Sequence, residues 1–570
     1  MKMEKNMIRT ASSAVFLLLF AVSAAVTAQA PDYGMLDGSP YDPATDPNPD
    51  LFISSWKNSM PRHSHGSLVE RDIFTANRSD PLKPHRKGAV LTSVNRFSHA
   101  SLETFTSTVP VTLRDEQLIF YIDSGEGTLF AGKQTAELHG GVGFIMPPGI
   151  EYTMKNTGGV PLTMYIISEP IPEGFKPNRT VVVRDENKLP FRGSNGHWTH
   201  IDKPFFTGAD GLAVLVGMNP VRYDPMTMGQ PHSHGVGVEE VWFALEGDIT
   251  LLLGKQLRNL PVGSAYKIPP DGKTPHSNIN VSDKPIKLFW FMMNVATEEI
   301  PYSQLTSKPY DPETEPNIDM FIRSWKESMP RHTHGSLLER DILLKGDGDT
   351  INPSVRGAAL KYVNRFTQAS LMAHHTTLPE TLHGEQEIFY VLSGKGTVTA
   401  GNVTEDLSAG IAVLMPENLE FSMSNTGDEP LEMYLISEPV PEGFRPNDNM
   451  LVVDVNSKPF YISDGHWIGV AKAVFATADG LGTLESIQVC TFSPMTFFHP
   501  HSHVEGTEEV WTGMYDPSYF LLGKQIRCQP PGTAYMIPTD GKTPHANFNV
   551  SDDPVKLFYF ARYRDHEVRK

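Results

Sequence analysis

The sequence predicts an all-β protein made of several closed barrels, and two observations carry that prediction. Segments such as LIFYIDSGEGTLFAG, VGFIMPPGIEYTMKN and PLTMYIISEP alternate short apolar runs with turns that contain Gly or Pro, whereas stretches with helical periodicity are scarce. At 570 residues the chain is also too long for a single hydrophobic core. The pattern favours antiparallel sandwiches or jelly-roll barrels, which close to hide the edges of their sheets.

The N-terminal segment has the pattern of a signal peptide. Three basic residues precede an apolar run over residues 14–26, and Ala28 and Ala30 give an A-x-A cleavage pattern. The apolar run is too short to span a bilayer comfortably, and no other stretch approaches spanning length. We therefore expect residues 1–30 to be removed and the mature chain to be exported, to the periplasm or out of the cell, without a membrane anchor.

Charge and cysteine content exclude three classes of protein. The formal net charge is −18. Because binding to nucleic acid needs a basic face, no nucleic-acid partner is expected. The cysteines are Cys490 and Cys528, which excludes a cysteine-ligated zinc site and a disulfide scaffold but leaves one disulfide bond open.

The sequence is a tandem duplication with a constant offset. The segment YDPATDPNPDLFISSWKNSMPRHSHGSLVERDI begins at Tyr41 and returns at Tyr310 as YDPETEPNIDMFIRSWKESMPRHTHGSLLERDI, an offset of 269 residues (310 − 41). Each half contains two similar all-β units, so four barrels are expected. We expect arms at residues 31–84 and 301–354, and barrels 1 to 4 at residues 85–190, 191–300, 355–458 and 459–566.

Barrel 2 contains three histidines and a glutamate with the spacing of a metal site. His232 and His234 are two residues apart, so both imidazoles would lie on one face of a strand. Glu240 follows six residues later, and His276 a further 36 residues on (276 − 240). Three imidazoles and one carboxylate on adjacent strands can surround a divalent ion and leave positions open for a ligand.

Barrel 4 repeats this set as His501, His503, Glu509 and His545, again with 36 residues before the last histidine (545 − 509). A single pair of histidines in a β protein would indicate ordinary hydrogen-bonded polar residues. Two complete sets at identical spacing favour metal binding instead. We therefore predict two divalent transition-metal ions per chain, and the ligand set suits Mn, Fe, Co, Ni, Cu or Zn without selecting among them.

These residues resemble the two motifs of the cupin superfamily, G-x5-H-x-H-x3–4-E-x6-G and G-x5-P-x-G-x2-H-x3-N. The second motif is matched, apart from one extra residue before the histidine, by Gly263, Pro269, His276 and Asn280 in barrel 2 and by Gly532, Pro538, His545 and Asn549 in barrel 4. The resemblance implies cupin-type jelly-roll barrels arranged as two bicupin halves in tandem.

The chain departs from the cupin motif in two ways. In barrel 4, Tyr515, Asp516 and Pro517 replace the glycine turn without touching a ligand. The loop before Glu240 and Glu509 is one residue longer than the motif, so Glu239 and Glu508 stay open as alternative ligands. Barrels 1 and 3 lack the ligand set and are expected to be metal-free scaffold. Their motif positions hold Thr112, Arg114, Leu118 and Tyr152 in barrel 1 and Thr381, His383, Glu387 and Phe421 in barrel 3.

Each arm contains a further HxH pair, formed by His63 and His65 in the first and by His332 and His334 in the second. Further ligands are missing nearby, so hydrogen bonding between arm and barrel is favoured over a metal or pocket role.

The pairs His197-Trp198 and His466-Trp467 open the two metal-bearing barrels. Core packing of these amphipathic side chains is favoured over contact with a bound ligand.

The resemblance leaves several functions open, because cupin barrels support many chemistries. It favours an exported metal-dependent enzyme that acts on a small oxygenated substrate. Among such enzymes, an oxidoreductase of the dioxygenase or oxalate type is slightly preferred. The alternatives are a metal-dependent isomerase or lyase acting on sugar acids, and a non-catalytic ligand-binding protein like the seed-storage cupins. No catalytic base is assigned, Tyr266 or Tyr535 is a candidate for orienting the substrate, and assembly into an oligomer stays open.

Overall fold

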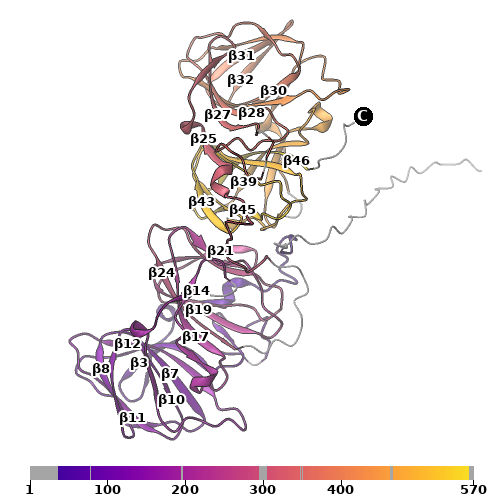
Figure 1. Ribbon diagram of the computed structural model, residues 1–570. Helices are drawn as coiled ribbons and strands as arrows, with labels where there is room; N and C mark the ends of the chain where they lie inside the picture. The colour runs from indigo at the N-terminus through magenta and orange to yellow at the C-terminus, as the bar shows by residue number, and fades with distance from the viewer. Residues whose placement is uncertain are drawn as a thin grey trace, which may run out of the picture.

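Four β-barrels form an elongated row, with barrels 2 and 4 meeting in the middle and barrels 1 and 3 at the ends (Figure 1). The predicted all-β, jelly-roll class is confirmed. This computed structural model describes residues 36–77, 79–193, 197–293, 305–346, 348–349, 351–462 and 466–563. The predicted signal peptide, residues 1–30, lies outside them.

Helical structure in the described part of the chain consists of short 3-10 turns. None of these is long and apolar enough to cross a membrane. Polar caps help to start them: the side chain of Asn48, for example, accepts a 3.0 Å hydrogen bond from the N–H of Asp50. The turns are η1 (Pro49–Phe52), η2 (Trp56–Asn58), η3 (Glu186–Lys188), η4 (Gly208–Asp210), η5 (Ile318–Phe321), η6 (Trp325–Glu327), η7 (Val455–Ser457) and η8 (Thr477–Asp479).

Barrels 1 and 3 each pack a large sheet against a four-stranded sheet. The large sheets run β13-β10-β7-β12-β5-β3-β2, with β4 beside β3, and β26-β27-β28-β35-β30-β33-β36. The small sheets run β6-β11-β8-β9 and β29-β34-β31-β32. Barrel 1 contains β2 (Arg62–Ser64), β3 (Leu68–Ala76), β4 (Ala89–Leu91), β5 (Arg96–Leu102), β6 (Val111–Thr112), β7 (Glu116–Ser124), β8 (Glu126–Ala131), β9 (Gln134–His139), β10 (Val142–Met146), β11 (Glu151–Asn156), β12 (Leu162–Pro170) and β13 (Val182–Asp185). Barrel 3 contains β26 (Arg331–Thr333), β27 (Leu337–Leu344), β28 (Arg365–Leu371), β29 (Glu380–Thr381), β30 (Glu385–Ser393), β31 (Lys395–Ala400), β32 (Val403–Ser408), β33 (Ile411–Met415), β34 (Glu420–Asn425), β35 (Leu431–Pro439) and β36 (Leu451–Asp454).

Barrels 2 and 4 have the same two-sheet plan. The large sheets run β1-β22-β19-β24-β17-β15-β14, with β16 beside β17, and β25-β44-β41-β46-β39-β38-β37. The small sheets run β18-β23-β20-β21 and β40-β45-β42-β43. Barrel 2 contains β1 (Ile53–Ser55), β14 (Arg192–Gly193), β15 (Ile201–Asp202), β16 (Phe206–Thr207), β17 (Gly217–Tyr223), β18 (Thr227–Met228), β19 (Glu239–Glu246), β20 (Ile249–Leu253), β21 (Gln256–Leu260), β22 (Ser264–Lys267), β23 (His276–Asn280) and β24 (Ile286–Met293). Barrel 4 contains β25 (Ile322–Ser324), β37 (Tyr461–Ile462), β38 (Val470–Ala476), β39 (Ser486–Phe492), β40 (Thr496–Phe497), β41 (Glu508–Gly513), β42 (Ser518–Leu522), β43 (Gln525–Gln529), β44 (Thr533–Met536), β45 (His545–Asn549) and β46 (Val555–Arg562).

Each arm supplies strands to both barrels of its own half. In the first arm, β1 pairs with β22 of barrel 2, whereas β2 and β3 extend the large sheet of barrel 1. In the second arm, β25 pairs with β44 of barrel 4, and β26 and β27 extend the sheet of barrel 3. The arms therefore tie the two barrels of a half together.

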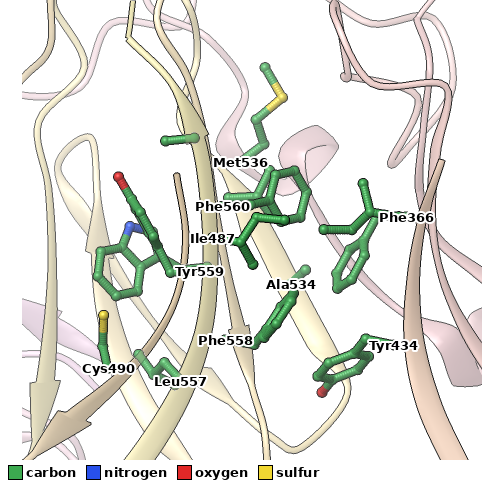
Figure 2. Close-up of a cluster of buried hydrophobic side chains, with 14 of the residues drawn as sticks. Phe366, Tyr434, Ile487, Cys490, Ala534, Met536, Leu557, Phe558, Tyr559 and Phe560 are labelled. Atoms are coloured by element: carbon green, nitrogen blue, oxygen red, sulfur yellow. The ribbon is translucent and has the colours of Figure 1, made fainter. Parts of the chain in front are cut away.

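The large sheets of the two barrels in each half pack against one another through aromatic side chains. In the second half, the ring of Phe366 lies 6.2 Å from Phe558 and 5.1 Å from Phe560, between centroids. Figure 2 shows Phe366 and Tyr434 facing this stretch of β46. In the first half, Phe97 lies 4.8 Å from Phe243 across the same kind of contact. Such pairs contribute about 0.5–1.5 kcal/mol each beyond their buried area.

Buried carboxylates fasten the barrels of each half to one another in both directions. Glu169 of barrel 1 accepts hydrogen bonds of 2.8 to 3.0 Å from three successive N–H groups, residues 213–215 of barrel 2. In the other direction, Glu239 of barrel 2 accepts hydrogen bonds from the N–H groups of residues 92–94 in barrel 1. Because a buried charge is costly without partners, these bonds hold the loops in place. Glu438 and Glu508 bind residues 482–484 and 361–363 in the same way.

The two halves meet through barrels 2 and 4 in a nearly symmetric interface. The indole N–H of Trp198 donates to the carbonyl of Thr306 at 2.8 Å, and that of Trp467 donates to the carbonyl of Asp37 at 2.7 Å. Both pairs of residues are related by the repeat offset, because 467 − 198 and 306 − 37 are each 269. The start of each arm therefore docks on barrel 2 or barrel 4 of the opposite half. The apolar cluster around these contacts contains residues that the repeat offset relates: Leu36 and Leu305, Met228 and Phe497, Leu252 and Leu521, Leu257 and Ile526, and Ile279 and Phe548.

Both cysteines are free thiols, so the disulfide bond that the sequence left open is not formed. Cys490 is buried in β39 and Cys528 is exposed in β43. Burial raises the pKa of the Cys490 thiol, which keeps it protonated and unreactive at neutral pH.

Candidate metal centres

The four candidate ligands of barrel 2 converge on one point. His232 and His276 form an isolated bridge with backbone hydrogen bonds of 3.3 and 2.9 Å, and one ring nitrogen of each of the three histidines lies within 4.8 Å of the others. Glu240 completes the set, with carboxylate oxygens 2.5 Å from Nε2 of His234 and 3.5 Å from Nε2 of His276. His234 follows the bridge in a loop rather than on a strand, so the strand predicted for the HxH pair is reduced to a single bridging residue.

Barrel 4 holds the second set in the same arrangement. Its three histidines also have ring nitrogens within 4.8 Å of one another, and Nε2 of His503 lies 3.0 Å from Nε2 of His545. The Glu509 carboxylate lies 3.0 Å from His503 and 3.4 Å from His545. The bridge between His501 and His545 repeats the one in barrel 2.

Backbone carbonyls orient the first histidine of each set. Nδ1 of His232 donates to the carbonyl of Gln230, and Nδ1 of His501 donates to that of His499, each at 2.8 Å. Because the proton is held on Nδ1, Nε2 is left as the nitrogen that can bind a cation.

Burial and neighbouring charges shift the pKa values of several ligands. Burial, together with the neighbouring imidazoles, holds the pKa of His232 and of His501 well below the usual value, so both rings are neutral. Burial alone would raise the pKa of Glu240, but the imidazoles of His234 and His276 outweigh it and hold that pKa well below its usual range. Burial alone would lower the pKa of His234, but the carboxylate of Glu240 outweighs it and raises that pKa, so this ring gives up its proton when an ion binds beside Glu240. Three imidazole nitrogens and an ionised carboxylate are ligands that a divalent ion accepts, so the residue types fit such an ion.

Each ligand carboxylate is also held by a tryptophan two residues further along its strand. The indole N–H of Trp242 donates to Oε1 of Glu240, and that of Trp511 donates to Oε1 of Glu509 at 2.6 Å. Residues two apart on a strand share a face, so the E-x-W pattern in both repeats contained this signal. We did not predict this contact from the sequence.

Glu239 and Glu508, the alternative ligands, face away from the histidines. Each directly precedes the metal-facing glutamate, so its side chain points to the opposite face of the strand. There it accepts the backbone N–H bonds that join the barrels, including 2.7 Å from the Thr92 hydroxyl to Glu239. The geometry therefore favours Glu240 and Glu509 as the ligands.

The two His-Trp pairs divide between core and centre. Trp198 and Trp467 are buried in the cluster between the halves, in line with the packing expected for them. His197, however, lies 4.7 Å from His232, and His466 lies 4.9 Å from His501, between ring centroids. These two histidines therefore pack beside the candidate ligands rather than in that cluster.

The walls beside the two centres differ in polarity. In barrel 2, Nδ1 of His200 hydrogen bonds with the Tyr223 hydroxyl at 2.9 Å, and the His200 ring stacks on His197 at 4.4 Å. The residue of barrel 4 that corresponds to His200 is Gly469, where a Cβ would collide with the ring of Phe498. One centre therefore has an imidazole–phenol wall where the other has an apolar aromatic one.

Tyr266 and Tyr535, the candidates for orienting a substrate, are fully buried. Their hydroxyls donate to Asn278 and Asn547 at 3.1 and 3.0 Å, so both already have a hydrogen-bond partner within the barrel.

In barrels 1 and 3, the second histidine of each arm reaches the barrel interior. Nε2 of His65 lies 2.7 Å from the Tyr152 hydroxyl, and Nε2 of His334 lies 3.0 Å from the Glu387 carboxylate. Tyr152 and Glu387 occupy positions where the motif would have metal ligands, so the arms supply hydrogen bonds to the barrels. Among the described residues, groups of three side chains able to hold a metal occur at the two centres of barrels 2 and 4 alone.

Comparison with known families agrees with this architecture. The family model for the cupin domain matches residues 220–292 in barrel 2 and 369–437 in barrel 3. These two matches, one in each half of the chain, support a tandem bicupin. No curated protein matches the sequence of this bicupin.

Three similar solved structures each correspond to less than half of the chain. A protein of Pseudomonas aeruginosa described as glyoxylate-induced is 11% identical, with 44% of the bicupin and 90% of that chain covered and a TM-score of 0.35. A variant of oxalate decarboxylase from Bacillus subtilis is 14% identical, with coverages of 45% and 80% and a TM-score of 0.34. AerE from Microcystis aeruginosa is 14% identical, with coverages of 42% and 98% and a TM-score of 0.33.

Proposed function

We propose that the protein is an exported metal-dependent enzyme that acts on a small oxygenated molecule as an oxidoreductase of the dioxygenase or oxalate type. One divalent transition-metal ion would be held by His232, His234, Glu240 and His276, and a second by His501, His503, Glu509 and His545. The observation that carries the proposal is the convergence of three imidazoles and a carboxylate in two separate barrels.

A metal held by four protein ligands keeps positions open for a substrate, and Mn, Fe or Cu supplies redox chemistry as well as Lewis acidity there. Partial exposure of the second histidine indicates the side from which a substrate enters: the side chains of His234 and His503 are 21% and 17% exposed. His197 and His466 stand beside the first histidine and can hydrogen bond with a substrate.

A second candidate is a metal-dependent isomerase or lyase acting on sugar acids. The His200–Tyr223 pair of barrel 2 favours it, because proton transfer needs groups that can accept and donate a proton near the metal. A non-catalytic ligand binder is less well supported, because both centres retain the whole ligand set.

Metal analysis of the purified protein combined with oxygen-uptake measurements tests the proposal. We expect two metal equivalents per chain. Iron, copper or manganese with oxygen consumption supports the oxidoreductase, whereas zinc or nickel without it supports the isomerase or lyase. Four equivalents, or none after reconstitution with metal, would contradict the assignment of the two centres.

Export is proposed from the sequence of the first 30 residues. The mature protein recovered from the periplasm or the medium should begin at or near residue 31, as measured by intact mass. Recovery of the full-length chain from the cytoplasm of its native host would refute this.

A further inference from the structure

The two centres have the same types of ligand. They differ on the strand that pairs with the one carrying the ligand glutamate. β46 of barrel 4 carries Tyr559 opposite Trp511, with ring centroids 4.6 Å apart. β24 of barrel 2 carries Trp290 at the corresponding position (559 − 269), opposite Trp242, with centroids 6.3 Å apart. A phenol therefore replaces an indole next to the tryptophan that holds the ligand carboxylate.

The Tyr559 hydroxyl reaches the ligand itself. It donates to Oε2 of Glu509 at 3.3 Å, and Tyr559 is only 3% exposed. Trp511 already donates to Oε1 of the same carboxylate, so both oxygens of Glu509 have a donor that is not a metal ligand. In Figure 2, Tyr559 lies on the same side of β46 as Cys490, away from Phe366 and Tyr434. The side chain thus points into barrel 4.

A second phenol completes the arrangement at the rim of the barrel. The hydroxyl of Tyr563 hydrogen bonds with that of Tyr559, and its ring lies 6.3 Å from His503 between centroids. Tyr563 is 36% exposed, so it stands between the centre and solvent. When Tyr563 donates its proton to Tyr559, the proton of Tyr559 is free to be donated to Glu509, and a chain of such bonds strengthens each member.

We propose that Tyr559 is a positioning residue that makes the two centres unequal, with barrel 4 holding its metal more tightly than barrel 2. Donors on both carboxylate oxygens fix the rotamer of Glu509 and modulate its charge, whereas the carboxylate of Glu240 faces an indole-bearing strand where the phenol is missing. Hydrogen bonds to a ligand from outside the coordination sphere typically change metal affinity by about 10–100-fold. This inference rests on the proposed metal binding.

The test uses the full-length chain with one centre removed at a time. The His276→Ala variant retains only the centre of barrel 4, and the His545→Ala variant retains only that of barrel 2. The affinity of each variant for Mn²⁺ is measured by competition with a chelator, and the bound ion is observed by electron paramagnetic resonance. We expect the barrel 4 centre to bind about 10–100-fold more tightly. Adding Tyr559→Phe to His276→Ala should lower that affinity by about tenfold or more and change the Mn²⁺ spectrum.

Trp290→Phe added to His545→Ala is the matched control and should leave affinity and spectrum unchanged. Equal affinities at the two centres, or an unchanged spectrum and affinity after Tyr559→Phe, would overturn the inference. If Tyr559→Phe does not fold, as judged by circular dichroism, Tyr563→Phe decides: a smaller loss of affinity in barrel 4 supports the inference, and none refutes it. Failure of either single-centre variant to bind one equivalent of Mn²⁺ would instead refute the proposed function.

Discussion

His276 and His545 are the ligands that the chain supplies last to each centre, and both are almost completely buried. Replacing either with alanine leaves three ligands and a cavity that admits water, so that centre should lose its ion while the other keeps one. Each single variant should retain part of the activity, and the double variant should have none. Metal content and turnover measured on the same samples check this. Complete loss of turnover in one single variant, with the other ion still bound, would show that the centres have different roles.

Substrate preference should differ between those single variants. Gly229 leaves room beside Tyr223 in barrel 2, whereas Phe498 fills the corresponding place in barrel 4. The polar wall formed with His200 should favour substrates with more hydrogen-bonding groups, so ratios of kcat/KM across a substrate series should diverge between His276→Ala and His545→Ala. Identical ratios would indicate that these walls do not contact the substrate.

Glu239 and Glu240 are neighbours with opposite tasks. Glu240→Gln should remove the ion of barrel 2, because a neutral amide is a poor ligand. Glu239→Gln should keep the ion but lower the free energy of unfolding by about 1–3 kcal/mol, since it weakens the charge-assisted bonds to residues 92–94. Metal analysis and urea unfolding separate the two outcomes. Loss of metal from Glu239→Gln would reverse the assignment of the ligand.

The arm strand β2 and the loop after it present their two histidines differently: His63 is exposed, whereas His65 reaches Tyr152 inside barrel 1. His65→Ala should lower the free energy of unfolding by about 1–2 kcal/mol without changing the metal content, because it removes one buried hydrogen bond. His63→Ala serves as the control, and should change stability by less than about 0.5 kcal/mol. Loss of one metal equivalent from His65→Ala would make the arm a source of ligands.

The fold class and the candidate ligands could be predicted because each depends on local pattern. Short apolar runs between Gly and Pro turns indicate strands, and the H-x-H spacing with its distant Glu and His is visible twice. The contacts made by Trp511, Tyr559 and His466 depend on which strands become neighbours, and the sequence does not reveal this without the paired register. The roles of Glu239 and Glu508 likewise depend on loops about 147 residues away.

The interface between the halves connects the beginning of the chain to its last barrel. Removal of residues up to and including Asp37 should therefore loosen barrel 4, because Leu36 packs in the cluster there and its carbonyl bonds with His499. Hydrogen exchange measured by mass spectrometry should increase around Trp467 and residues 497–499. Exchange around Trp198 should stay unchanged, since that residue binds the other arm. An increase of exchange confined to barrel 2 would contradict the docking of the first arm on barrel 4.

The docking of the first arm on barrel 4 also sets an order of events during synthesis. Asp37 and Trp467 are 430 residues apart in the chain, and Leu36 and His499 are 463 apart. At roughly 5–20 residues per second, the first segment leaves the ribosome about 20–90 s before its binding surface exists. Barrels 1 and 2 can close during that interval, but the apolar face of barrel 2 must wait for its partner. Leu36 and Asp37 are thus made well before barrel 4, but they can reach their final contacts only after barrel 4 has folded.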